Sequence, residues 1–263
     1  MADKHRYSIQ LGWDDHLEKL QFAVERGLGV EIAAFATGPG LHDHSTRRAM
    51  ERGLAAALKD FPHRRSFHGA FIDITLHSQD PDVAAVARQR LQRDMETASR
   101  LGCERVVFHT GYNPLVPAPN YEGEFLERHA AFWPVLAEAW PGLEICLENL
   151  WERSPDLLAR LLRTIGHPRV GLCLDVAHAH VYGDVGIEFW FEMLQDRIIH
   201  MHWNDNQGDT DSHLAIGAGS IPWKHVLAAT ATLARGISVV LELRSLAAIR
   251  QSLSHIALLK SGE

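Results

Sequence analysis

The chain has 263 residues, 46% hydrophobic and 22% charged, which is enough to bury the core of one large domain. Its 26 Lys and Arg against 33 Asp and Glu give a net charge of −7, so no bulk positive field favours duplex DNA as a partner. Three cysteines without a C-x-x-C pair exclude a disulfide framework, the absence of a long apolar stretch excludes a membrane span, and we expect a cytoplasmic protein.

Short apolar runs alternate with longer segments of helical periodicity from end to end. The predicted strands are Tyr7–Leu11, Val30–Phe35, Arg65–Ile72, Arg105–Thr110, Leu143–Leu147, Val170–Leu174, Ile198–His202 and Ile237–Leu243. No linker divides the chain, so we expect a single domain over residues 1–263. Eight strand–helix units in about 250 residues predict one (β/α)8 TIM barrel. A doubly wound open sheet is the alternative, but no G-x-G-x-x-G follows the first strand.

Helical periodicity is clearest over Asp82–Leu101 and Phe125–Trp140. Four glycines each close a helical segment just before a strand, as left-handed C-caps do: Gly27, Gly102, Gly166 and Gly236.

Histidines and carboxylates stand at the ends of the predicted strands, where the chemistry of a TIM barrel collects. Nine such candidates lie there or in the loop after the seventh strand: His68, His109, Glu148, Asp175, His178, His202, Asp211, His213 and Glu242. Taken singly, each has an ordinary explanation, and Arg153 or Arg244 could neutralise a buried glutamate. Their recurrence on successive strands favours a metal site at the C-terminal mouth of the barrel.

Most of the other histidines are predicted to lie on the surface or in loops, among them His77, His129 and His167. His200 shares its strand face with His202 and should lie one layer deeper in the barrel. Arg153 and Lys224 are candidates for holding an anionic substrate.

Imidazole and carboxylate ligands without thiolate suit Zn²⁺, Mn²⁺ or Fe²⁺. An ion that keeps an open position takes about three to five protein ligands, so nine candidates predict two or three metals. Such ions can bridge a hydroxide and assist in-line displacement at phosphorus. The ligand set therefore predicts a metal-dependent phosphoesterase that acts on a small phosphorylated substrate.

The strand-end motifs resemble those of the endonuclease IV and xylose isomerase-like TIM-barrel superfamily. The resemblance is carried by His68, HTG at His109, LEN at Glu148, LDVAH at Asp175 to His178, HMHWND at His202, D-S-H at Asp211 to His213 and LEL at Glu242. Endonuclease IV hydrolyses a phosphodiester at abasic sites with three zinc ions. The G-E-G of that enzyme reads Gly217-Ala218-Gly219 here.

Carried over by motif, the resemblance implies three groups of ligands. His68, His109 and Glu148 would hold one metal, and Glu148 would bridge to a second metal. The second metal would also be bound by Asp175, His202 and Glu242, and a third by His178, Asp211 and His213.

The same superfamily contains sugar isomerases and epimerases. These resemble the chain through Glu148, Asp175, His202 and Glu242 around a single ion, with Glu148 and Glu242 as catalytic acid and base. A sugar or sugar-phosphate isomerase or epimerase is therefore the alternative function. A structural or storage metal centre without an open coordination position is the non-enzymatic alternative.

Overall fold

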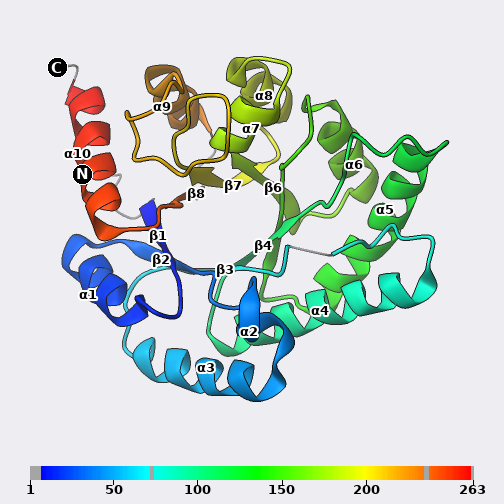
Figure 1. Ribbon diagram of the computed structural model, residues 1–263, viewed down its shortest axis with the longest axis horizontal. Helices are drawn as coiled ribbons and strands as arrows, with labels where there is room; N and C mark the ends of the chain where they lie inside the picture. Colours follow the sequence, from blue (N-terminus) through cyan, green and yellow to red (C-terminus); the bar gives the residue numbers. More distant parts are fainter. Residues whose placement is uncertain (1–6, 72–73, 234–236, 262–263) are drawn as a thin grey trace.

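The computed structural model of the protein describes residues 7–71, 74–233 and 237–261. Eight parallel strands form a closed barrel at its centre, with helices around them (Figure 1). The strands are β1 (Tyr7–Leu11), β2 (Gly29–Ile32), β3 (Arg65–His68), β4 (Arg105–His109), β5 (Glu144–Glu148), β6 (Val170–Asp175), β7 (Ile198–Trp203) and β8 (Ser238–Leu241). Each pairs with the next in chain order, and β8 closes the barrel against β1. The predicted TIM barrel is confirmed, and the open-sheet alternative is wrong.

The helices of the described residues alternate with the strands on the outside of the barrel. They are α1 (His16–Arg26), α2 (Gly38–His42), α3 (His44–Ala57), α4 (Pro81–Arg100), α5 (Tyr121–Ala139), α6 (Asp156–Ile165), α7 (Val176–Tyr182), α8 (Ile187–Leu194), α9 (Trp223–Thr232) and α10 (Leu246–Ser261).

Four predicted strands, those of β2, β3, β4 and β8, are longer than the observed ones. β2 ends at Ile32, so the apolar residues that follow are not part of the strand. Among them, Phe35 is buried and stacks on Phe67 of β3. β3 ends at His68, and the predicted end at Ile72 lies outside the described residues. The apolar pattern predicted strands that are too long, because it indicates burial, and a buried apolar residue need not be hydrogen-bonded in a strand.

Glycine caps end three helical segments where the sequence predicts them. Gly27, Gly102 and Gly166 have φ angles of 67°, 69° and 59°, a left-handed conformation that a glycine adopts without steric cost. The fourth predicted cap, Gly236, lies outside the described residues.

The main core lies between the strands and the surrounding helices. α6 illustrates it, because its apolar face buries Leu158, Leu161 and Leu162 completely. Inside the barrel, Cys146 and Cys173 form a separate small cluster with Val107, as interior filler. Among the described residues, no helix is long and apolar enough to span a membrane. This packing leaves the strand ends at the mouth free for polar side chains.

Candidate metal centre

Parallel pairing brings the strand-end candidates to the C-terminal mouth of the barrel. His68, His109, Glu148 and Asp175 are the last residues of β3, β4, β5 and β6. The register sets His109 level with Glu148 and Asp175 level with His202. His202 comes just before the end of β7, and Glu242 directly follows β8. Strand geometry alone therefore places six of the nine candidates on one ring of the barrel.

Glu148 is the centre of this ring and is completely buried. Its Oε2 atom lies 2.9 Å from His109 Nε2 and 3.4 Å from His68 Nε2. Its Oε1 atom lies 3.0 Å from Nδ1 of His202. The two oxygens thus face different histidines, as expected of a carboxylate that bridges two ions.

A second set of ligand atoms surrounds Nδ1 of His202. Glu242 Oε2 lies 3.4 Å from that nitrogen, and Asp175 Oδ2 lies 4.0 Å from it. One ligand atom each from Glu148, Asp175, His202 and Glu242 lies within 4.8 Å of the others, and the same holds for His68, His109 and Glu148. Glu148 belongs to both sets, which matches the first two ligand groups that the family resemblance implies.

The remaining three candidates meet beside this ring. Oδ2 of Asp211 lies 3.3 Å from Nε2 of His178 and 3.1 Å from Nε2 of His213. His213 has a φ angle of 49°, a left-handed conformation that is costly for a side chain with a Cβ atom. Strained backbone of this kind clusters at functional sites. The structure therefore brings all nine sequence candidates together, and their role as ligands stays a prediction.

Asp205, completely buried just after β7, anchors the long loop that carries Asp211 and His213. Its Oδ2 atom accepts hydrogen bonds of 2.8 Å from Gly217 N and from Trp223 Nε1. A backbone bridge from Asp205 to Leu214 closes the loop around the two candidates. A long loop thus holds its two ligand candidates in a fixed position.

Backbone carbonyls orient three of the imidazoles. Nδ1–H of His68 donates to Gly69 O, that of His178 to Asn149 O and that of His213 to Glu242 O, at 3.0, 2.9 and 3.0 Å. A carbonyl can only accept, so Nδ1 carries a hydrogen, and in the neutral ring Nε2 has the lone pair. These rings are therefore held in the tautomer that a metal ligand needs.

Several buried oxygens in the centre lack a hydrogen-bond partner among the described residues: Glu148 Oε2, Asp175 Oδ2, Glu242 Oε2 and Asp211 Oδ1. Arg153, which could have neutralised a glutamate, lies instead 3.1 Å from Asp184, and its side chain is 54% exposed. Arg244 is also exposed. Buried carboxylate oxygens that accept no hydrogen bond are costly unless cations bind them, so the residues present fit divalent metal ions.

The pKa shifts of these side chains also indicate a site for cations. Burial opposes the charge on Glu148, but the neighbouring His109 and His202 hold its pKa well below the usual range. Burial likewise opposes protonation of His68, yet its contact with Glu148 raises its pKa to about 9. Burial, together with the charges of Glu148 and Glu242, raises the pKa of Asp175 to about 7. The proton on His68 therefore occupies a place that a metal ion would take.

Two residues that contact the centre were not among the sequence candidates. Gln10 on β1 donates a 2.8 Å hydrogen bond to Oε1 of Glu242. Glu31 on β2 is completely buried, and despite burial its pKa is held well below the usual range by His202 and His200. Gln10 and Glu31 are each a polar residue within a predicted strand. For Glu31, the signal in the sequence is a charged residue between two apolar neighbours, Val30 and Ile32.

A cavity of about 520 Å³ opens beside His109. Its lining is mainly aromatic and apolar and includes Phe71, Tyr121 and Trp151. His77, which also lines it, is uncharged at neutral pH because burial lowers its pKa to about 4. A neighbouring hollow of about 350 Å³ shares Trp151 with this cavity and reaches Arg153. The space next to the centre thus suits an uncharged organic group.

Some sequence expectations outside the centre are wrong or untested. His129 is buried within α5, so its predicted place on the surface or in a loop is wrong. His77 and His167 lie outside helices and strands, as predicted, but are buried. Lys224 is exposed in the first turn of α9. The assignment of Arg153 and Lys224 to substrate binding stays a prediction.

The sequence is similar to proteins of known families. The family described as xylose isomerase-like TIM barrel matches residues 20–259. An uncharacterized protein of Methanocaldococcus jannaschii is 32% identical over 171 residues, which cover 61% of this chain but only 57% of that protein. A probable endonuclease 4 of Mycobacterium ulcerans is 27% identical over 218 residues, or 79% of this chain and 83% of the relative.

Two solved structures share the whole fold. A D-tagatose 3-epimerase-like protein superposes with a TM-score of 0.80 at 23% identity and covers 97% of both chains. A Thermus thermophilus protein whose structure was solved after soaking with zinc chloride has a TM-score of 0.77 at 27% identity, over 98% of this chain and 99% of its own.

Proposed function

We propose that this chain, which belongs to the xylose isomerase-like TIM barrel family, is a divalent-metal-dependent hydrolase of phosphate esters. One observation carries the proposal. The four ligands Glu148, Asp175, His202 and Glu242 would serve a single ion, yet the mouth also holds His68 with His109 and the separate set around Asp211. Five further ligand candidates favour a centre of two or three ions, with zinc as the first choice and manganese or iron as alternatives.

The three ligand sets of the mouth would hold these ions, with Glu148 shared between two of them. When bound, the ions would supply Lewis-acid activation of a phosphoryl group and of water. The chain itself contributes the fixed orientation of the ligands. Gln10 holds Glu242, and backbone carbonyls direct the rings of His68, His178 and His213.

The cavity beside His109 supports a small-molecule substrate. Its aromatic and apolar wall would receive an uncharged organic group, while the anionic phosphoryl group would lie at the metal ligands. Trp151 is 41% exposed and lines both hollows, so it can stack on a ring that enters the cavity.

The decisive test combines a metal count with turnover. Elemental analysis of protein reconstituted with Zn²⁺ should give two or three ions per chain. The reconstituted protein should hydrolyse bis(p-nitrophenyl) phosphate, and the Trp151→Ala variant should raise KM more than it lowers kcat. A single ion at full occupancy, with His68 and His109 unligated, would contradict the proposal.

A sugar or sugar-phosphate isomerase or epimerase is the second candidate. The compact set Glu148, Asp175, His202 and Glu242 favours it, because that set is sufficient for one ion with two glutamates beside it. Glu148 and Glu242 would then act as acid and base on a ketose. Incorporation of solvent deuterium into a ketose carbon would support this function, and absence of exchange across a sugar panel would count against it.

Relatives named as probable endonuclease 4 make DNA a partner to test directly. The net charge of −7 disfavours the phosphate contacts from which duplex affinity arises. We therefore expect no cleavage of a duplex oligonucleotide with an abasic site under conditions in which bis(p-nitrophenyl) phosphate is hydrolysed.

A further inference from the structure

Glu31 lies inside the barrel, directly beneath the candidate metal centre. The register of β2 sets it level with Gln10 of β1 and Ser66 of β3. Its carboxylate is completely buried, an expensive position for a charge unless it is well paired. No role for this residue follows from the nine ligand candidates.

Three side chains from other strands pair with the Glu31 carboxylate. Ser66 Oγ donates to Oε2 at 2.8 Å, and His200 Nε2 lies 2.8 Å from the same oxygen. His202 Nε2 lies 2.8 Å from Oε1. The carboxylate therefore faces both histidines of β7, one with each oxygen.

The contact with Glu31 decides which nitrogen of His202 can bind a metal. An anion 2.8 Å from Nε2 favours a hydrogen on that nitrogen. Nδ1 lies on the side of the ring that faces Glu148 and Glu242, and it donates to Glu148 Oε1 at 3.0 Å, so a metal ion bound by these carboxylates would take the place of its hydrogen. His202 differs in this respect from His68, whose Nδ1 donates to a backbone carbonyl.

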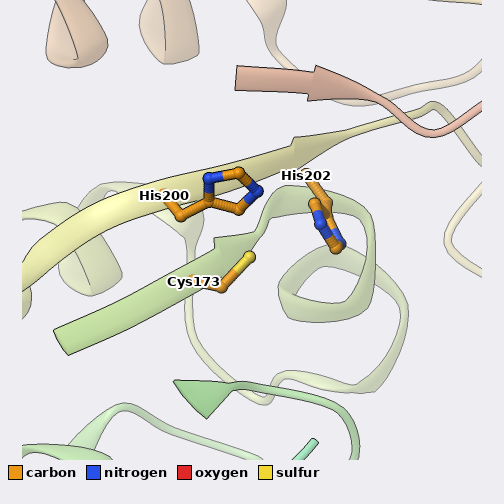
Figure 2. A group of neighbouring side chains, drawn as sticks. All are labelled: Cys173, His200 and His202. Atoms are coloured by element: carbon orange, nitrogen blue, oxygen red, sulfur yellow. The ribbon is translucent and has the colours of Figure 1, made fainter. Parts of the chain in front are cut away.

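His200 and Cys173 lie at the same depth and could be mistaken for a separate metal site. Figure 2 shows them with His202 on the neighbouring strands β6 and β7, and their ligand atoms lie within 4.8 Å of one another. However, both ring nitrogens of His200 are already engaged, Nε2 with Glu31 and Nδ1 with Ser238. Burial also raises the pKa of the Cys173 thiol well above its usual value. His200 therefore supports Glu31 instead of binding an ion.

We infer that Glu31 is a positioning residue of the metal centre, which fixes the ring of His202 so that Nδ1 is its ligand atom. The inference rests on the proposed metal centre. A carboxylate that orients a ligating histidine typically changes metal affinity by about 10- to 100-fold. Glu31 should therefore control the affinity of the ion shared by Glu148, Asp175 and Glu242, while the set around Asp211 is unaffected.

The test compares Glu31→Gln with wild-type protein. Zinc affinity is measured by competition with a chromophoric chelator, and folding is checked by circular dichroism. We expect the variant to bind the ion held by His202 about 10- to 100-fold more weakly. Long-range ¹H–¹⁵N spectra of the zinc-loaded wild type should show His202 protonated at Nε2, and this signature should be lost in the variant.

Two further variants keep the test sharp. Glu144→Gln is the matched control, because Glu144 begins the strand that Glu148 ends and pairs with Arg105 at 2.7 Å, away from the mouth. It should leave zinc affinity unchanged. Glu31→Asp keeps the charge but shortens the side chain, and it should also weaken zinc binding, so it carries the test if Glu31→Gln fails to fold.

The outcomes separate the two proposals. Equal zinc affinity, within about twofold, and an unchanged His202 tautomer in folded Glu31 variants would overturn the positioning role. Absence of zinc binding in the wild-type chain would overturn the metal centre itself. An additional zinc ion bound by Cys173 in the wild type would also overturn the inference, because His200 would then be a ligand.

Discussion

Replacing Asp205 by Asn tests how the ligand-bearing loop is held. Oδ2 accepts from Gly217 N and Trp223 Nε1, both at 2.8 Å, while Oδ1 accepts from Asn206 N at 3.0 Å and Ile221 N at 3.3 Å. In either orientation, the NH₂ group of an asparagine faces two of these donors. Two hydrogen bonds to a charged group are lost, and two buried donors remain unpaired.

Each hydrogen bond to a charged group contributes about 1.5–3 kcal/mol, so the expected loss of unfolding free energy is about 3–6 kcal/mol. For a domain of this size, 1 kcal/mol corresponds to about 2–4 °C in Tm, which predicts a fall of at least about 6 °C. Differential scanning calorimetry of metal-free protein measures this fall. A typical domain has about 5–15 kcal/mol of stability, so the variant stays folded where the wild type has more than about 6 kcal/mol.

Asp209→Asn is the matched control, since Asp209 is an exposed residue of the same loop that accepts a hydrogen bond from Thr210 N. Its Tm should change by less than about 2 °C, as expected for a surface substitution. A fall of under about 2 °C in Asp205→Asn would show that the four donors find other partners and that Asp205 does not hold the loop.

Three further predictions concern the centre and the outer layer. Glu148→Gln should abolish turnover under both proposed functions, because the carboxylate is the shared ligand of two sets and the candidate base; retained turnover would show the assignment wrong. His213→Ala should remove one ion per chain by elemental analysis and leave the others, because His213 contacts Asp211 outside the Glu148 sets; loss of every ion would instead indicate an interdependent cluster. Burial lowers the pKa of His77 to about 4, whereas a His in the unfolded chain has a pKa near 6.5. Between these two pH values the unfolded chain binds more protons than the folded one, so the stability of the fold decreases as the pH falls. The urea midpoint of His77→Asn should therefore fall less between pH 7 and pH 5 than that of the wild type, and parallel slopes would contradict the assigned pKa.

The order of strands and helices was within reach of the sequence. Alternating apolar runs and helical periodicity are local properties, and the glycine caps Gly27, Gly102 and Gly166 mark where helices end. The ends of β2 and β3 could not be predicted from the sequence, because burial by itself does not distinguish a strand residue from an apolar loop residue that covers the barrel.

The sequence alone is enough to predict which side chains gather at the mouth, because all strands of a parallel barrel end on the same side and their last residues therefore lie there. The orientation of these side chains depends on contacts between distant parts of the chain. Glu31 meets His200 across 169 residues of sequence, and Gln10 meets Glu242 across 232. Pairing over such separations depends on closure of the barrel, which no local pattern encodes. The tautomers of the histidines follow from those distant contacts and from backbone carbonyls.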